Sequence, residues 1–172
     1  MKWKRLAIVT VTTVAVLATA FGLSRRADAQ TTNQLAGTYR LTSVKRTVVA
    51  TGETTEPLGK SPQGYIMYGR DGRMMLLMVA EKRPTPTALA TMTDQERVDL
   101  FKTMLAYSGS YDFGGKIVTH HIDVSWNQIV TGTHQVRNVS LDGRKLVLTT
   151  NAEPAPSSGI VSVLVITWEK VD

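Results

Sequence analysis

The chain contains no cysteine among its 172 residues. It therefore has no disulfide framework, no cysteine for lipid attachment and no thiolate ligand for a zinc ion. Only three histidines are present, which leaves few side chains for an imidazole metal site. A fold without these covalent or metallic supports must be held together by its core alone.

Long apolar runs are also scarce, and the clearest one lies near the N-terminus. A basic start at residues 2–5 precedes an uncharged, mostly apolar run at residues 6–23, and Ala27-Asp28-Ala29 follows. This order of a basic, an apolar and a small-residue segment is typical of a secretory signal peptide. We therefore expect a signal at residues 1–29, a mature domain at residues 30–172 that begins with Gln30, and a periplasmic or secreted location.

An uncleaved membrane anchor is the alternative for the same segment. The apolar run is close to the roughly 17-residue minimum for a spanning helix. Its four threonines and the well-formed Ala27-Asp28-Ala29 site favour cleavage. After cleavage we expect no stable membrane insertion, and under either alternative the domain faces outward.

The basic charge of the chain is a property of its N-terminal segment. The formal net charge is +6. Most of it lies before residue 30, where Asp28 alone opposes five basic residues: Lys2, Lys4, Arg5, Arg25 and Arg26. The remaining chain is nearly balanced, so the composition predicts no nucleic-acid partner. No phosphate-binding loop, dinucleotide fingerprint or Gly-x-Ser-x-Gly elbow is present, so we expect neither a cofactor nor hydrolase chemistry.

Tight turns divide the rest of the chain into strands. Asp71-Gly72, Gly114-Gly115 and Asp142-Gly143 can each adopt the positive φ angles of two-residue hairpins. The runs around these turns, with one strand before them and one after them, bring the count to about eight: residues 37–45, 64–68, 73–79, 107–113, 116–126, 133–140, 145–150 and 160–170. This pattern predicts an all-β, antiparallel domain that closes into a barrel.

One segment has helical spacing. Thr93 and Glu96 form a capping-box pattern, and Val98, Phe101 and Leu105 then recur every three or four residues. We expect one short amphipathic helix at residues 94–106, whose apolar face must lie on another element.

The strand at residues 73–79 is apolar on both faces. Met74, Leu76 and Met78 alternate with Met75, Leu77 and Val79, whereas a strand with one wet face alternates apolar with polar residues. We expect one face to fill the barrel and the other to be covered by the helix or by a second subunit. The last strand has the same character, and together they predict a possible homodimer.

The ordered set of motifs resembles a known family. The segment Leu35-Ala36-Gly37-Thr38-Tyr39 is similar to the Gly-x-Trp signature that opens a lipocalin, with tyrosine in the tryptophan position. Together with the segments at residues 62–68, 71–74, 107–111, 119–121, 132–137, 141–143 and 168–169, it resembles the bacterial and fungal lipocalin-like domain family. The resemblance implies a closed barrel with an internal cavity for a small, largely apolar ligand. In some relatives it implies cyclisation or isomerisation inside that cavity.

Two adjacent histidines offer the clearest chemistry. His120 and His121 point to opposite faces of one strand, so they cannot share a metal ion. The even-numbered face is apolar, so we expect His120 to point inward and His121 outward beside Asp123. His134 is expected opposite Ser125 or Trp126, roughly 15 Å from His120. A metal site is therefore not predicted.

Several side chains could line a ligand cavity. Tyr107, Gly109, Tyr111 and Phe113 share one strand face, with the glycine leaving room between aromatic rings. Met74, Met78, His120 and Trp126 are further candidates for the wall, although ordinary core packing explains each of them as well. Arg137 could stack on Tyr39 and close the barrel, as the resemblance implies, or it could pair an acidic group of the ligand.

Three hypotheses follow from these residues. The first is an exported protein that binds a small hydrophobic molecule in its barrel. The second is a cofactor-free isomerase, cyclase or lyase that uses His120 with a tyrosine such as Tyr111 for acid–base catalysis. The third is an assembly module whose doubly apolar strands form an interface. The first two differ in whether a second titratable group faces His120.

Overall fold

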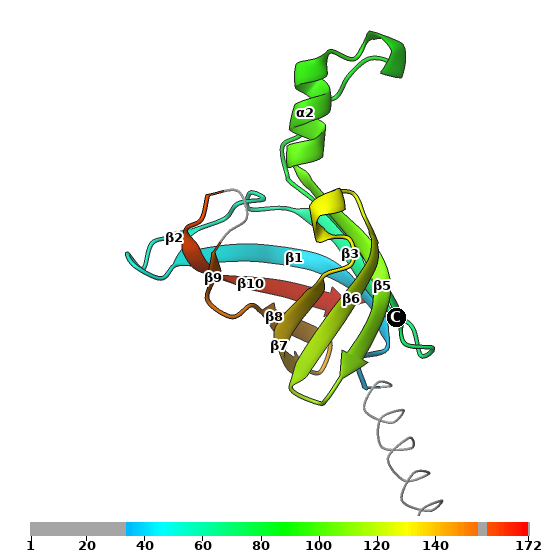
Figure 1. Ribbon diagram of the computed structural model, residues 1–172, viewed down its shortest axis with the longest axis vertical. Helices are drawn as coiled ribbons and strands as arrows, with labels where there is room; N and C mark the ends of the chain where they lie inside the picture. Colours follow the sequence, from blue (N-terminus) through cyan, green and yellow to red (C-terminus); the bar gives the residue numbers. More distant parts are fainter. Residues whose placement is uncertain (1–33, 155–157, 172) are drawn as a thin grey trace, which may run out of the picture.

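The computed structural model describes residues 34–154 and 158–171, and it shows a closed antiparallel barrel (Figure 1). The expected signal peptide and the expected new N-terminus at Gln30 lie outside these residues. Eight long strands form the wall: β1 (Gly37–Val48), β3 (Gln63–Tyr68), β4 (Arg73–Val79), β5 (Met104–Phe113), β6 (Ile117–Ser125), β7 (His134–Asp142), β8 (Lys145–Thr149) and β10 (Val161–Lys170). Two-residue strands β2 (Thr54–Thr55) and β9 (Glu153–Pro154) extend β1 and β10 at the rim.

The strands are hydrogen-bonded in the order β1-β3-β4-β5-β6-β7-β8-β10, and β10 pairs with β1 to close the barrel. The three predicted hairpin turns join β3 to β4, β5 to β6 and β7 to β8. Their glycines Gly72, Gly115 and Gly143 have φ angles of 78°, 86° and 56°, the left-handed region that glycine adopts without steric cost. The sequence prediction of an eight-stranded antiparallel barrel is confirmed.

Alternation along the strands fills the barrel. Met74, Leu76 and Met78 of β4 are buried, as predicted, together with Tyr39 of β1 and Trp168 of β10. Leu35 packs at the end of the barrel that carries the tight turns, where its carbonyl accepts a 3.1 Å hydrogen bond from the Tyr39 hydroxyl. The end of the barrel that carries the tight turns is therefore filled with apolar side chains.

The predicted helix is present but shorter, and it does not cover the barrel. Helix α2 (Asp94–Lys102) ends before residue 106 because β5 begins at Met104. The helix projects away from the barrel (Figure 1) and buries none of its residues. The expectation that it covers the outer face of β4 is wrong, and Met75 on that face stays 54% exposed.

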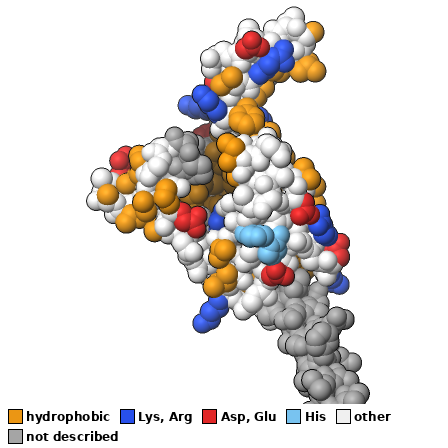
Figure 2. Space-filling view, viewed as in Figure 1, with side chains coloured by type: hydrophobic (Ala, Val, Ile, Leu, Met, Phe, Trp, Pro, Cys, Tyr) orange, Lys and Arg blue, Asp and Glu red, His pale blue; other side chains and the backbone are white. Residues whose placement is uncertain are grey.

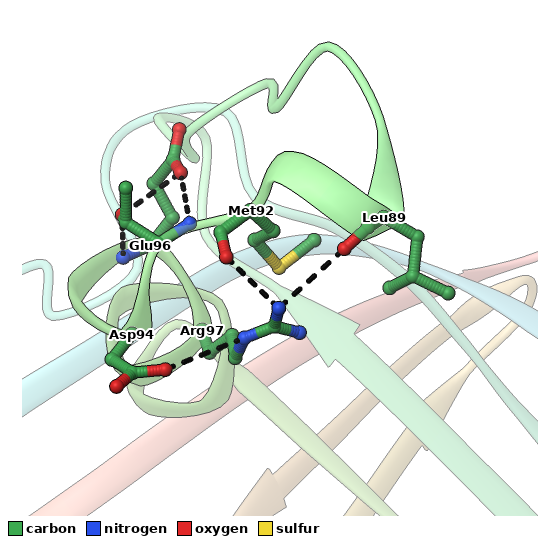
Figure 3. Close-up of polar contacts among 6 residues, drawn as sticks. Leu89, Met92, Asp94, Glu96 and Arg97 are labelled. Atoms are coloured by element: carbon green, nitrogen blue, oxygen red, sulfur yellow. Dashed lines mark hydrogen bonds and ion pairs between the residues drawn. The ribbon is translucent and has the colours of Figure 1, made fainter.

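Helix α2 is held by its N-terminal cap and by contacts to the turn that precedes it. The Thr93 hydroxyl accepts from the Glu96 amide, and the Glu96 carboxylate accepts from the Thr93 amide at 2.8 Å. Arg97 donates to the carbonyl oxygens of Met92 and Leu89, the latter in the 3-10 turn η1 (Leu89–Thr91), and pairs with Asp94 (Figure 3). These contacts order an arm that the core does not stabilise. None of the helices in the described residues is long and apolar enough to cross a membrane.

A bulge between β5 and β6 changes which face each residue of β6 presents. Ser108 pairs with Val124 and Gly109 with Ile122, so Asp123 is the extra residue. Beyond it the inward and outward positions exchange, and Val124 is 64% exposed. The prediction that Val124 and Trp126 share the inward face of His120 is therefore wrong. Trp126 instead lies against Phe101 of α2, with ring centroids 6.1 Å apart.

Candidate functional site

His120 occupies the centre of the barrel wall. It lies on β6, opposite Tyr111 of β5 and Gln135 of β7, and it is fully buried. The predicted inward orientation of this histidine is confirmed. Because a buried polar group must be hydrogen-bonded to be tolerated, its partners determine what this position can do.

Both ring nitrogens of His120 contact tyrosine hydroxyls. The Nε2 atom lies 2.7 Å from the Tyr68 hydroxyl of β3, and the Nδ1 atom lies 2.8 Å from the Tyr107 hydroxyl of β5. Both tyrosines are buried. We call this group the Tyr68–His120–Tyr107 relay. It supplies the titratable groups facing His120 that sequence reasoning could not place.

The histidine of the relay is neutral at physiological pH. The pKa of His120 is lowered from 6.5 to about 3, mainly by burial and to a smaller extent by the charges of Arg137 and His121. A neutral imidazole carries one N–H donor and one nitrogen acceptor. One tyrosine therefore donates to the ring, and the other accepts from it.

The tyrosines are protonated as well. Burial raises the pKa of Tyr107 to about 12, against a smaller opposing effect of Arg137. Burial also raises the pKa of Tyr68 well above its usual value of 10.0, and the neighbouring Tyr107 adds to this effect. The whole relay is thus an uncharged chain of hydrogen bonds.

One tyrosine hydroxyl of the relay has a proton for which the relay itself provides no acceptor. The tyrosine that accepts the imidazole N–H keeps its own O–H free to donate, whichever tautomer is present. Within the described part of the chain, no further acceptor contacts the Tyr68 or Tyr107 hydroxyl. The relay therefore offers one spare hydrogen-bond donor inside the barrel.

Tyr111, the partner expected for His120, has another role. It lies opposite His120 in the ladder, but its hydroxyl donates to the Gly69 carbonyl at 2.9 Å. Its ring packs edge-on against Tyr68 with centroids 4.8 Å apart. Burial raises the pKa of Tyr111 to about 12, and Asp71 and Tyr39 add to the effect. Tyr111 thus positions Tyr68 rather than the imidazole.

Arg137 faces the barrel interior from β7, where it lies opposite the buried Val118. Its guanidinium donates to the Gln135 side-chain oxygen at 2.7 Å and to the Val136 carbonyl at 2.8 Å. Among the described residues, Lys170 is the cation that lies over the Tyr39 ring, 5.7 Å from its centroid, and the predicted stacking of Arg137 there is not observed. Arg137 instead keeps its two hydrogen bonds within β7.

The remaining predicted wall residues divide into two groups. Met74, Met78 and Phe113 are buried inward, as expected. Gly109 does not leave open space, because a Cβ atom there would lie 1.8 Å from the His121 carbonyl oxygen. The glycine is required by the close approach of β6 at the bulge.

The other two histidines lie together on the outside, contrary to the expected register. His121 pairs with His134 across β6 and β7, with their Nδ1 atoms 2.9 Å apart, and its Nε2 atom lies 2.6 Å from Asp112. Asp123, the expected neighbour of His121, pairs instead with Arg73. No group of three or more potential metal ligands occurs in the described residues.

The surface of the described residues carries a hollow and a groove. A hollow with an apolar floor lies between the lobe that carries β2 and β9 and the side that carries β6 and β7 (Figure 2). It lies on the same side as the 3-10 turn η2 (Gln128–Val130) (Figure 1). A groove of about 760 Å³ near the β3–β4 turn is lined by Tyr68, Met74 and charged residues that include Arg70 and Lys170.

Sequence reasoning missed Tyr68 and Gln135. Alternation along residues 64–68 places Tyr68 on the face of Ile66, so its inward orientation was available from the pattern. Gln135 could not be found, because its position opposite His120 depends on the β6–β7 register.

Comparison with known proteins gives one match. The model of a family described as a lipocalin-like domain matches residues 36–171. No curated protein matches the chain.

Proposed function

The chain belongs to the lipocalin-like domain family, and we propose that its barrel binds a small, largely apolar molecule that carries a hydrogen-bond acceptor. The acceptor, a carbonyl or hydroxyl oxygen, accepts a hydrogen bond from the spare hydroxyl of the Tyr68–His120–Tyr107 relay. The observation that carries this proposal is the surplus O–H donor among the mostly apolar side chains that surround the relay. A buried donor without an acceptor is costly, and a ligand oxygen removes that cost.

The surroundings of the relay fit such a ligand. Met74, Met78 and Tyr111 present thioether and aromatic surface on neighbouring inward positions. Ligand sites are mostly apolar, with a few polar groups that fix orientation. The hollow in Figure 2, with hydrophobic side chains on its floor, is the place at which we propose that such a ligand enters. We therefore keep the ligand wall proposed from the sequence and add Tyr68 to it. Trp126 is left out of the wall, because it lies at the base of α2.

The pKa values of the relay favour binding over proton transfer. A general acid or base works best when its pKa lies near the working pH. Burial moves the pKa of His120 down to about 3 and that of Tyr107 up to about 12, so both depart from neutrality. Uncharged donors and acceptors of this kind are suited to recognising a polar group without ionising it.

Acid–base catalysis is the second candidate, because the relay connects two hydroxyls through an imidazole. A proton given up by one tyrosine to a bound substrate would be replaced through His120 from the other tyrosine, and the tyrosinate left there would regain a proton from the substrate as the product forms. Such an isomerase, cyclase or lyase would need no cofactor. His120→Phe should then abolish turnover of apolar enones or lactones, since a general acid or base contributes about 10²–10⁴-fold in rate.

We also propose that the protein acts outside the cytoplasm, in the periplasm or as a secreted protein. This rests on the signal-like composition of residues 1–29.

A fluorescence titration tests the binding proposal. The probe is 6-propionyl-2-(dimethylamino)naphthalene, a neutral apolar ketone whose emission responds to polarity and to hydrogen bonding. We expect 1:1 binding, and we expect Tyr68→Phe or Tyr107→Phe to weaken it about 2- to 10-fold, the effect of one lost hydrogen bond. Tyr65→Phe is the matched control, because Tyr65 lies on the exposed outer face of β3.

Two results would overturn the proposal. One is the absence of saturable binding for this ketone and for the apolar dye N-phenyl-1-naphthylamine alike. The other is an affinity for the ketone that both relay variants leave unchanged.

A further inference from the structure

A second arginine, Arg46, also faces the barrel interior. It lies on β1, whereas Arg137, the residue that could pair with an acidic group of the ligand, lies on β7. Arg46 follows Val44 on the inward face of β1, and it pairs across the ladder with Leu164 of β10. Val44 is buried, and Leu164 packs against the core. Because directly opposed residues share a face of the sheet, Arg46 points to the same side as these apolar side chains.

Within the part of the chain that the structure describes, no hydrogen bond or ion pair holds the guanidinium of Arg46. Its Nε atom is buried without a hydrogen bond. Of the carboxylates in the described residues, none lies within ion-pair distance of Arg46 or Arg137. On the outer face, by contrast, Arg40 pairs with Glu169 at 3.1 Å, and Arg73 pairs with Asp123 at 2.8 Å. These two outward arginines of the barrel wall are thus neutralised by carboxylates, whereas the two inward arginines are not.

Arg137 has partners, but both are neutral. Its two hydrogen bonds go to the amide oxygen of Gln135 and to a backbone carbonyl. The positive charge remains uncompensated, and it acts on the relay by lowering the pKa of His120, Tyr68 and Tyr107. A partly buried charge without a counter-charge is unfavourable, and a bound anion would offset that cost.

The two arginines belong to one row of the barrel wall. Thr150, which is buried, and Leu164 lie between them on the neighbouring strands, since Thr150 bonds to Leu164 and the β7–β8 ladder places it next to Arg137. Three interstrand steps of about 4.8 Å give roughly 14 Å along the wall. Two long side chains can approach a common anion from positions this far apart.

We propose that the ligand of this barrel carries a carboxylate, which Arg137 binds, with Arg46 adding a second positive charge. The planar guanidinium donates two parallel hydrogen bonds to a carboxylate, and neither arginine has another anion to bind. This inference rests on the proposed binding function and narrows its ligand to an apolar acid.

The test compares one acid with its neutral ester. The probes are 11-(dansylamino)undecanoic acid and its methyl ester, titrated at about pH 8 into the wild type. We expect the acid to bind about tenfold more tightly or better, as for a charge-assisted bond. Arg137→Met should remove most of this preference, and Arg46→Met should reduce it. Arg40→Met is the matched control on the outer face of β1 and should keep the full preference.

The ester makes the outcomes separable. Retained ester binding shows that each variant is folded, and for a variant that does not fold, the wild-type ratio alone decides the question. Equal affinity of the wild type for acid and ester overturns the carboxylate inference while the binding function stands. A ratio unchanged by Arg137→Met and Arg46→Met overturns it too. If neither probe nor the neutral ketone binds, the proposed function fails and this inference fails with it.

Discussion

Acidification should destabilise the barrel through His120. The pKa of this imidazole is about 3 in the folded protein, against 6.5 for an unperturbed histidine. Between these values the unfolded chain binds a proton that the folded chain does not. The contribution is therefore fully favourable above about pH 6.5, is lost as the pH falls, and stops changing near pH 3.

The magnitude follows from the pKa difference. Each pH unit inside this window costs about 1.4 kcal/mol of unfolding free energy, so about pH 4.5 should cost roughly 2–3 kcal/mol relative to about pH 7.5. That is a large part of the about 5–15 kcal/mol that stabilises a typical domain. The effect is large because burial removes the imidazolium from water, and the charges of Arg137 and His121 further disfavour protonation.

Urea unfolding at the two pH values measures this effect in the wild type and in two variants. His120→Phe should be less stable at neutral pH by about 1–3 kcal/mol, because it leaves the Tyr68 and Tyr107 hydroxyls without their partner. It should also lose less stability on acidification than the wild type does. Tyr65→Phe, which changes an exposed tyrosine on the outer face of β3, should keep the wild-type acid dependence. Equal acid dependence in His120→Phe and the wild type would refute the reasoning.

Four further predictions concern the arm, the bulge, the subunit interface and export. Thr93→Ala should destabilise α2 locally by about 1 kcal/mol; because α2 buries no residue, amide exchange in the arm should accelerate while the melting temperature of the barrel stays constant. Gly109→Ala should cost about 3 kcal/mol or more, since its Cβ would overlap the His121 carbonyl, whereas Gly114→Ala, with open space around it, should melt like the wild type. Met75→Lys should shift a dimer toward monomer in sedimentation velocity if the exposed face of β4 is the interface, and a monomeric wild type would remove the homodimer. N-terminal sequencing of exported protein should begin at Gln30, and an intact Met1 in membranes would favour the anchor.

The strands and turns could be predicted because they depend on local pattern. Glycine-containing dipeptides marked the hairpins, and alternation placed Met74, Met78 and His120 inward. The capping box predicted where α2 begins, since Thr93 and Glu96 are three residues apart at the first turn of the helix. Each of these signals is contained in a few consecutive residues.

The rest depends on contacts between distant residues. Asp123 is an extra residue in β6, so the residues after it point to the opposite face and Trp126 lies outside the barrel. No local sequence pattern predicts this bulge. The partners of His120 come from β3 and β5, so they require the closed register. The helix pattern predicted a buried face for Phe101, which the tertiary structure leaves 47% exposed.

Native mass spectrometry of the mature protein, purified from its own host, tests the central claim most directly. If the barrel binds a small molecule at the Tyr68–His120–Tyr107 relay, the protein should carry one additional mass at 1:1 stoichiometry. That mass should be lost or reduced in His120→Phe and retained in His134→Gln. A wild-type protein with the bare mass of its polypeptide, together with no uptake of the ketone probe, would contradict the account.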